Sequence, residues 1–310
     1  MPKRGGFRCE QCQSPSESQD RCIVFWYYEL MLNRDGKEQV ALCRLHELGD
    51  VELLKASYYK HSFAKHFHEC YAFGVIESGA LGFFYRGKNV VAREGEINLA
   101  IPGESHDGFA AEEHGWRYRM LYVSTDLISR AVSEVTDKPG GLPFFREGVI
   151  QDRALAARIR SCHMSLERRQ ASLLEKETSL LTVIVDLVTR HAEEKPIPAR
   201  ASMGHRSVGR AREYLHAHYG DKISLEQLSA VAGLSRYHLL RLFAREVGLP
   251  PHAYLIQVRV RKAKELMTQG MPLAEVALCT GFCDQSHLNR LFRRVVGVAP
   301  GEYSKIVQDA

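Results

Sequence analysis

Three histidines in the first half of the chain have a spacing that could bring their side chains into one site. His66 and His68 are two residues apart, so on a β-strand both side chains would face the same side. His106 follows the turn-forming residues 102–105. Neutral imidazoles bind transition metals or hydrogen-bond a polar ligand, but they can also be ordinary packed or surface side chains. The residues alone therefore leave open a metal site, a small-molecule pocket and a structural role.

Aromatic side chains near these histidines could form the apolar wall of a small-molecule pocket. We expect Tyr71 and Trp116 to belong to it, and further candidates are Phe73, Phe84, Tyr85 and Tyr118. Aromatic residues in β-runs are otherwise core residues. Ser105 and His106 are sequence neighbours rather than a positioned nucleophile and base. We therefore predict a binding site with no catalytic residue.

A second set of candidate residues lies in a repeat near the C-terminus. Residues 235–243 align with residues 284–292 at an offset of 49 positions, and the register holds beyond them without a gap. The first-copy residues that recur identically are His238, Leu239, Arg241, Leu242, Phe243, Val247, Gly248, Pro251 and Tyr254. This agreement indicates a duplicated structural unit.

Each copy carries the signals of two helices joined by a tight turn. In the first, Ser224 and Gln227 predict a capping box, Gly233 predicts the end of that helix, and Ser235 can cap the next one. The corresponding signals in the second copy are Pro272, Gly281 and Asp284. This order is typical of a helix-turn-helix.

The second helix of each copy has an apolar face and a polar one. At 100° per residue, Leu239, Leu242 and Phe243 share one side and are expected to pack. The residues expected on the free faces are Arg236, Tyr237, Leu240 and Arg241 in the first copy, and Gln285, Ser286, Asn289, Arg290 and Arg293 in the second. Arg, Gln, Asn and Ser side chains can bond base edges or phosphates. Solvated faces of surface helices would look similar, but duplication, capping and charge together favour double-stranded DNA as the partner.

The charge distribution supports that partner. Residues 200–310 carry 16 Lys and Arg against 9 Asp and Glu, whereas residues 1–199 carry 26 against 28. A positive C-terminal third beside a near-neutral remainder indicates a polyanion at that end.

The stretch GFCDQSHLNRLFRRVVGVAPGEY, residues 281–303, resembles the signature of the AraC/XylS family of bacterial transcription regulators. The resemblance covers about residues 206–304. It implies two helix-turn-helix units joined by a long helix from Pro251 to about Gln269, with the buried stripe Ile256, Val260, Ala263 and Met267. It also implies that the protein forms a homodimer, contacts RNA polymerase and activates rather than represses transcription.

By the same resemblance, the base-facing residues are Tyr237, Leu240 and Arg241 of the first unit and Gln285, Ser286 and Arg290 of the second. Leu240 is apolar where many relatives carry a polar residue. It would contact a thymine methyl group or exclude water. We treat Lys262 and Lys264 of the joining helix as phosphate-facing or solvated residues.

Residues 66–69 and 102–106 resemble the two short motifs of the cupin barrel, over about residues 45–125, and regulators of this family often carry such a barrel. Metal cupins have a Glu a few residues after the two histidines, and here Ala72 stands there. Glu69 would face away from His68 on a strand. We therefore expect no metal and no cofactor, and expect His66, His68 and His106 to line a pocket for a small-molecule effector. The alternative is a metal-dependent cupin enzyme fused to a DNA-binding domain.

The elements that position these residues define an α+β chain: an N-terminal cupin-like β-barrel with a helical hairpin, then an all-α domain with two helix-turn-helix units. Short β-like runs from Val51 to about Thr125 are separated by the turn-forming clusters SGA, YRGK, REG and PGES. Helical periodicity then runs from Asp152 to Glu194 and breaks at RRQAS, which predicts two antiparallel helices. We expect this pair to form a dimer contact. The alternative is that it covers the barrel.

The expected domain boundaries follow from these patterns. Residues 1–40 are expected to be a flexible tail, 41–150 the effector-binding barrel, 151–194 the hairpin, 195–205 a linker and 206–310 the DNA-binding domain. No run approaches the roughly 18 apolar residues of a bilayer span, and the start lacks a signal peptide's apolar stretch. We expect a cytoplasmic location without membrane contact, and reduced thiols at the scattered cysteines.

Overall fold

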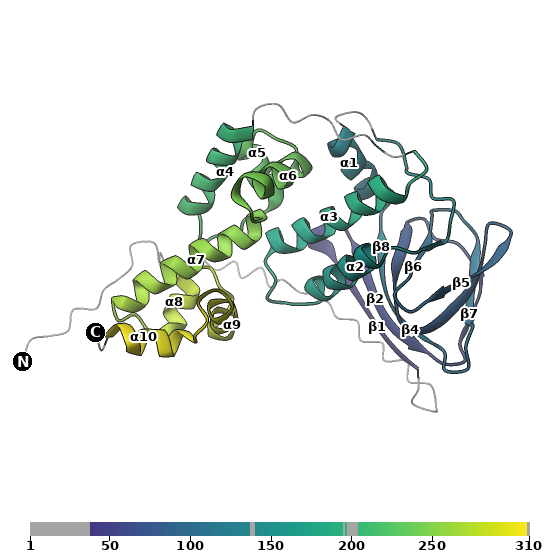
Figure 1. The fold of residues 1–310 in the computed structure, drawn as a ribbon, viewed down its shortest axis with the longest axis horizontal. Coiled ribbons are helices and arrows are strands. Elements are labelled where there is room, and N and C mark those ends of the chain that lie inside the picture. The colour runs from purple at the N-terminus through teal and green to yellow at the C-terminus, as the bar shows by residue number, and fades with distance from the viewer. Residues whose placement is uncertain (1–37, 137–139, 195, 197–203, 309–310) are drawn as a thin grey trace, which may run out of the picture.

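The computed structural model describes residues 38–136, 140–194, 196 and 204–308. A rolled antiparallel sheet lies at one end of the molecule and a helical domain at the other, with helices α1, α2 and α3 between them (Figure 1). The expected tail falls outside the described residues up to position 37, but Gln39 and Val40 already belong to a strand. Most of the expected linker is also outside them.

The strands are β1 (Gln39–Leu45), β2 (Val51–Tyr58), β3 (Ser62–His66), β4 (Tyr71–Tyr85), β5 (Lys88–Arg93), β6 (Ile97–Ala100), β7 (His106–Ala110), β8 (Trp116–Val123) and β9 (Val149–Ile150), with a short 3-10 turn η1 (His46–Leu48). They pair in the order β1-β2-β8-β4-β6-β9. Strand β5 also pairs with β4, and β7 pairs with both β3 and β4. All pairings are antiparallel. The cupin-like barrel expected from the sequence is therefore present as an antiparallel β domain.

Strand β4 differs from the prediction. The cluster Ser78-Gly79-Ala80 was expected to be a turn between two strands, but β4 continues through it as one strand. The pairing with β8 shifts register between Ile76 and Ser78, which marks a β-bulge. Gly79 has φ +71°, and a Cβ there would lie 2.0 Å from the Gly115 carbonyl oxygen. The glycine therefore lets the strand bend and pass from one side of the barrel to the other.

Alternation along β4 separates two cores. Tyr71, Phe73 and Val75 pack in a cluster that includes the helices, whereas Ala72 and Ile76 pack inside the barrel. The two sets occupy alternate positions because successive strand residues face opposite sides.

The helices are α1 (Thr125–Thr136), α2 (Arg153–Leu166), α3 (Leu173–His191), α4 (Gly204–Ala217), α5 (Leu225–Ala232), α6 (Arg236–Val247), α7 (Pro251–Thr268), α8 (Leu273–Cys279), α9 (Gln285–Val296) and α10 (Pro300–Gln308). The predicted hairpin is α2 and α3. Its apolar stripes are buried within this chain, with Ile159 at 0% and Ile184 at 1% exposure. Helix α1 was not predicted. None of the described helices is long and apolar enough to cross a bilayer.

The duplicated unit is visible in the side chains. Phe243 meets Tyr254 edge to face with ring centroids 5.5 Å apart, and Phe292 meets Tyr303 in the same way at 5.5 Å. The predicted capping box of Ser224 and Gln227 is present, and Ser235 and Asp284 cap α6 and α9. Helix α7 joins the two units and buries Val260, Ala263 and Met267, whereas Ile256 is only partly buried.

Candidate effector pocket and nucleic-acid interface

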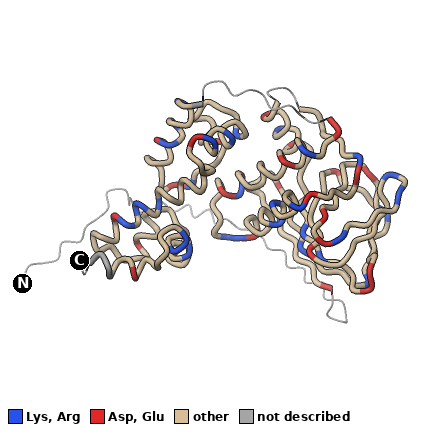
Figure 2. Tube along the Cα trace, viewed as in Figure 1, with Lys and Arg blue, Asp and Glu red and all other residues tan. Residues whose placement is uncertain are grey.

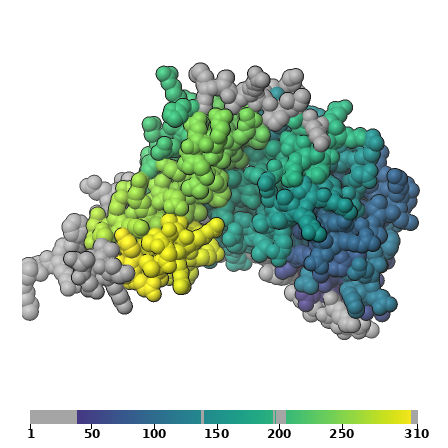
Figure 3. All heavy atoms as spheres, in the orientation of Figure 1, coloured from purple at the N-terminus to yellow at the C-terminus, as the bar shows by residue number. Residues whose placement is uncertain are grey.

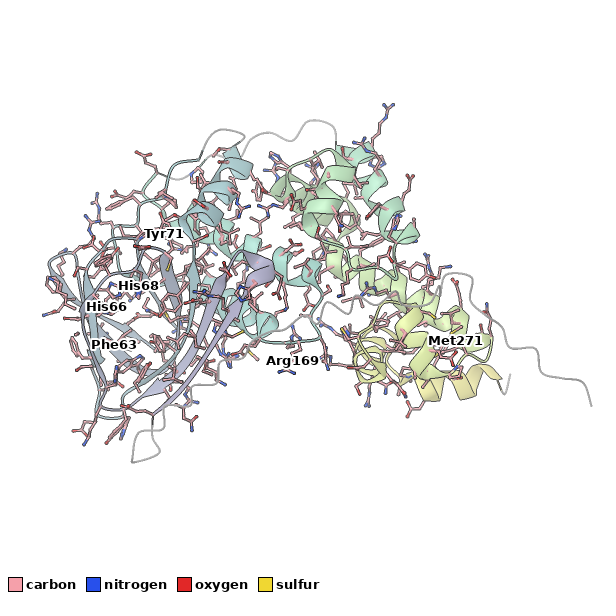
Figure 4. The ribbon with its side chains drawn as sticks, turned by 180° about the vertical axis from the view of Figure 1, so that it is seen from behind. Phe63, His66, His68, Tyr71, Arg169 and Met271 are labelled. Atoms are coloured by element: carbon pink, nitrogen blue, oxygen red, sulfur yellow. The ribbon has the colours of Figure 1, made fainter. Side chains whose placement is uncertain are left out.

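The barrel encloses a cavity of about 140 Å³ beside the three histidines. His66 and His68 lie side by side within the barrel (Figure 4). The cavity is lined by Leu54, Phe63, His66, His68, Ala72, Leu81, Phe83, Asn98, Leu99, Ala100, His106, Asp107, Gly108, Tyr118, Met120 and Tyr122. An apolar wall with a few polar groups is the usual form of a small-molecule site.

Strand pairing brings the histidines together. His66 ends β3 and stands opposite His106 at the start of β7. Ring centroids are 4.5 Å apart for His66 and His106, 4.9 Å for His66 and His68, and 5.0 Å for His68 and His106. The pairing of β3 with β7 therefore brings His66 and His106 together, and the loop after β3 adds His68 as the third member.

Backbone carbonyl groups orient two of the rings. His66 Nδ1 lies 2.8 Å from the Ala64 carbonyl oxygen, and His106 Nδ1 lies 2.9 Å from that of Glu104. A carbonyl oxygen only accepts, so each Nδ1 donates its proton and Nε2 keeps a free lone pair while the ring is neutral.

Burial favours the neutral form of two of the three rings. Burial and the two neighbouring imidazoles lower the pKa of His68 to about 4, and burial also lowers the pKa of His106. The side-chain oxygen of Asn98 is buried without a partner among the described residues. The cavity therefore presents the neutral imidazoles of His68 and His106 and an amide acceptor, which suit a polar, uncharged ligand group.

The donor set also fits a metal ion. One candidate ligand atom from each histidine lies within 4.8 Å of the others, and the described residues add no carboxylate to the group. Asp107 borders the cavity, but its Oδ1 accepts a hydrogen bond from the Phe84 amide at 2.7 Å. Three neutral imidazoles with an open position can hold a divalent transition metal.

Two expected pocket residues lie elsewhere. Tyr71 faces the helices, and its hydroxyl group donates to the Pro143 carbonyl oxygen at 2.8 Å. Trp116 packs at the barrel end against Tyr58, with ring centroids 5.1 Å apart. Neither borders this cavity, and of the further candidates only Tyr118 lines it.

The sequence analysis missed several cavity residues. Met120 and Tyr122 share the inward face of β8 with Tyr118, so alternation from Tyr118 could have indicated them. Phe63 and Asn98 have no such signal, because they depend on how β3 and β6 pair with distant strands.

The second helix-turn-helix presents an open polar face. The side chains expected on the free face of α9 are all exposed: Gln285, Ser286, Asn289, Arg290 and Arg293. Arg294, which was not among the expected residues, lines the same surface depression as Arg290 and Arg293. The basic residues on α9 are arginines, which appear as blue segments of this helix in Figure 2. This face is suited to phosphates and base edges.

The corresponding face of α6 lies against the barrel domain. Tyr237, Leu240 and Arg241 line a groove of about 1000 Å³ whose other wall is α2 and α3. Leu240 is only 9% exposed. Arg236 forms an ion pair with Glu134 of α1, with 2.6 Å between Nη2 and Oε1. Of the four residues expected to be free on α6, only Arg241 is exposed.

A buried arginine braces the two units through α7. Arg259 is 5% exposed, and its guanidinium group donates to the carbonyl oxygens of Tyr219 at 2.7 Å and Asp221 at 2.9 Å. It also lies over the Phe282 ring, 6.0 Å from its centroid. Burial lowers the pKa of Arg259 to about 10, which leaves it charged at neutral pH. It links the end of the first unit's α4 to the turn of the second unit.

Comparison with known proteins identifies both domains. Residues 48–183 match the family model described as AraC-like ligand binding domain, and residues 228–306 match a helix-turn-helix domain model. An HTH-type transcriptional regulator of Bacillus subtilis, YbfI, is 32% identical over 227 residues, which are 73% of this chain and 81% of YbfI. The transcriptional activator NphR of Rhodococcus is 33% identical over 41% of this chain and 39% of its own length. ToxT of Vibrio cholerae is a solved structure with TM-score 0.34, 12% identity, and coverage of 82% of this chain and 97% of ToxT.

The barrel with its cavity and the paired helix-turn-helix units define an effector-controlled DNA-binding regulator. The chain belongs to the AraC-type family of transcriptional regulators.

Proposed function

We propose that this regulator activates transcription by holding promoter DNA with α6 and α9 in consecutive major-groove segments, under the control of a small molecule bound in the barrel. The observation that carries the proposal is the exposed row on α9, which ends in Arg290 and Arg293. Arg290 has the same place in its unit as Arg241 has in α6, 49 positions earlier. Two equivalent recognition helices on one chain are suited to two neighbouring major-groove segments of the same duplex.

The proposed base-reading residues are those expected from the sequence. Tyr237, Leu240 and Arg241 would act from α6 and Gln285, Ser286 and Arg290 from α9. Arg236, Asn289 and Arg293 would contact phosphates or flanking bases. For α6 this requires that its face leave the groove beside α2 and α3.

We further propose that the bound DNA is bent. Helix α7 has 18 residues and is therefore about 27 Å long. Consecutive major-groove segments on one side of straight DNA are about 34 Å apart. If the recognition helices are held closer than one turn, the duplex must bend toward them, at a cost of a few kcal/mol.

A footprint tests this function. Full-length protein is used to enrich a duplex from a random-sequence pool, and hydroxyl-radical cleavage then maps the contacts. We expect two protected segments about one helical turn apart, and anomalous migration in circular-permutation gel shifts. A single protected segment would contradict the use of both helices, and unbent DNA would contradict bending.

The effector is proposed to bind among His66, His68 and His106, with the buried Asn98 oxygen as an additional acceptor. The histidine cluster also supports a second candidate, a metal-dependent cupin enzyme fused to the DNA-binding domain. Metal analysis of the purified protein separates the two, because an enzyme of that kind requires stoichiometric iron or manganese held by the three histidines. We favour the regulator without catalytic residues, cofactor or metal, because no carboxylate of the described residues joins the three histidines.

Three finer features remain part of this proposal: contact with RNA polymerase, a homodimer and a cytoplasmic location. The stripes of α2 and α3 are buried against their own barrel. A homodimer would therefore use another face of this pair, and sedimentation of the free protein would detect it.

A further inference from the structure

We propose that Glu134 and Glu177 of the barrel domain inhibit the first helix-turn-helix by occupying the helix N-termini that DNA phosphates would otherwise bind. The inference rests on the proposed DNA-binding function and adds how that function is held off. Three separate observations support it. The first is the carboxylate contacts, and the second is the covered face of α6. The third is that, among the described residues, no carboxylate of the barrel domain or the hairpin contacts the N-terminus of α9.

Glu134 closes the start of α6. Its Oε1 accepts from Arg236 Nε at 2.7 Å, and its Oε2 accepts from the Tyr237 amide at 3.2 Å. The N-cap Ser235 accepts from the His238 amide at 3.3 Å. Because the N-terminal amides of a helix form an anion site, the Glu134 carboxylate takes the place of a phosphate and also engages an arginine proposed for DNA.

Glu177 does the same at α5. Its Oε2 accepts a hydrogen bond from the Leu225 amide, the first residue of that helix, at 2.6 Å. In a helix-turn-helix the first helix crosses the DNA backbone while the second enters the major groove. The start of α5 is therefore a second place where a backbone phosphate would be received. In each helix of the first helix-turn-helix, one first-turn amide is bound by a carboxylate, from α1 for α6 and from α3 for α5.

The position of α6 agrees with a closed state. Its base-facing side chains Tyr237, Leu240 and Arg241 look across a groove at α2 and α3. The first unit lies directly against the hairpin in Figure 3. A recognition helix enters a groove about 12 Å wide with a sugar-phosphate backbone on either side. Because α2 and α3 form the other wall of this groove, we infer that the two domains separate before α6 reads DNA.

The second unit lacks this restraint among the described residues. Asp284 of the same helix-turn-helix caps α9, and the neighbouring Cys283 makes one long contact to the barrel domain, 3.9 Å from its Sγ to the Gln170 carbonyl oxygen. The base-facing residues of α9 are exposed. The recognition helix α9 is therefore open to DNA, whereas α6 is covered.

A short path connects the effector cavity to Glu134. Tyr118, Met120 and Tyr122 of β8 line the cavity, and β8 leads through Ser124 directly into α1. Glu134 lies in the last turn of α1. A ligand that moves the inner side chains of β8 therefore acts on the strand that anchors the helix carrying this carboxylate.

The contact between the domains is incompletely packed. A cavity of about 210 Å³ lies between them, and its lining includes Arg130 of α1, Glu177 of α3 and Arg236 of α6. Well-packed interiors have few voids larger than a water molecule. Apolar side chains of α3 and of the first helix-turn-helix, including Leu181 and Leu225, belong to one buried cluster at this contact. The carboxylate contacts therefore add to an apolar contact between the domains.

The test compares the full-length wild type with Glu134→Ala, Glu177→Ala and the double variant. The control is Asp126→Ala, which removes the same charge from an exposed position of α1. The probe is a duplex enriched from a random-sequence pool by the double variant, and affinity is measured by fluorescence anisotropy. We expect the double variant to bind about tenfold tighter than the wild type or more, because the closed state loses its charge-assisted hydrogen bonds to the helix N-termini.

Hydrogen–deuterium exchange supplies a readout independent of DNA. Peptides that contain Leu225 and Tyr237 should exchange faster in the double variant than in Asp126→Ala. If the double variant does not fold, Glu134→Gln serves in its place, because it removes the charge and keeps the shape.

The outcomes separate the two hypotheses. If the double variant and Asp126→Ala bind the duplex equally well and exchange equally slowly, the inhibitory contact is refuted. Arg290→Ala would then still weaken binding if the proposed function holds. If no duplex is enriched by either the double variant or the wild type, the DNA-binding proposal fails, and the inhibitory contact fails with it.

Discussion

His66 and His106 stand directly opposite each other on β3 and β7, and their ring centroids are 4.5 Å apart. Each ring is held by the carbonyl group of the residue two positions before it. Backbone carbonyl groups therefore orient both rings before any ligand binds. Such preorganisation reduces the entropy lost on binding.

We expect His106→Ala to abolish ligand stabilisation while the fold remains. A compound found by thermal-shift screening of the wild type should raise its melting temperature and leave that of His106→Ala unchanged. His114 is exposed and lies outside the cavity, so His114→Ala should respond like the wild type. An equal response of both variants would place the ligand elsewhere.

Arg290→Ala should weaken binding of the enriched duplex by about 1–3 kcal/mol and relax its sequence preference, because a bidentate base contact is lost. Binding curves on the enriched duplex and on random duplex measure both effects. Lys264→Ala serves as the control, since this residue lies on α7 above the Tyr303 ring. It should lower affinity on both duplexes equally, if at all, and an Arg290→Ala variant with the same behaviour would mean that the face of α9 is misassigned.

Arg259→Met should destabilise the C-terminal domain by about 1–3 kcal/mol, since the carbonyl oxygens of Tyr219 and Asp221 lose their donor. It should also weaken DNA binding, because the two units are no longer braced. Urea denaturation and binding to the enriched duplex measure the two effects. The control is Arg261→Met, at an exposed neighbouring position. Equal stability of the two variants would show that Arg259 does not stabilise the contact between the two units.

Stability should fall on acidification because of His163. Its ring is buried between β8 and α2, and burial, with a smaller effect of Arg119, lowers its pKa to about 3. The unfolded chain takes up a proton near pH 6.5, whereas the folded chain does not until about pH 3. The contribution to stability is therefore complete above pH 6.5 and declines as the pH falls toward 3, by at most about 1.4 kcal/mol per pH unit.

The measurement is urea denaturation at pH 7.5 and 5.0. We expect His163→Gln to lose about 2 kcal/mol less than the wild type between these values. His114→Gln, at an exposed position, should keep the wild-type difference. A wild-type difference retained by His163→Gln would assign the acid sensitivity to other groups.

The helix-turn-helix units were predictable from the sequence because their signals are local. Ser224 with Gln227, Ser235 and Asp284 cap helices within three residues of themselves. Because the same pattern of signals occurs twice, each copy supports the helix-turn-helix prediction for the other. The histidine cluster was also predictable, because two of its members lie two residues apart in the sequence and the third follows a turn-forming stretch.

The cavity wall and the covering of α6 were not predictable in this way. Tyr71 and Trp116 have the same aromatic character as Tyr118, and only the pairing of distant strands decides which ring borders the cavity. Glu134 is an unremarkable acidic residue in the sequence, and 102 positions separate it from its partner Arg236. Local patterns contain no information about contacts of this kind.

Helix α7 has a consequence for the promoters that this protein can serve. In the proposed binding mode a single helix sets the distance between the two recognition helices, so an insertion of about five base pairs would turn one half-site to the far side of the duplex. New binding sites would then evolve by base changes within either half-site, and not by changes in their spacing.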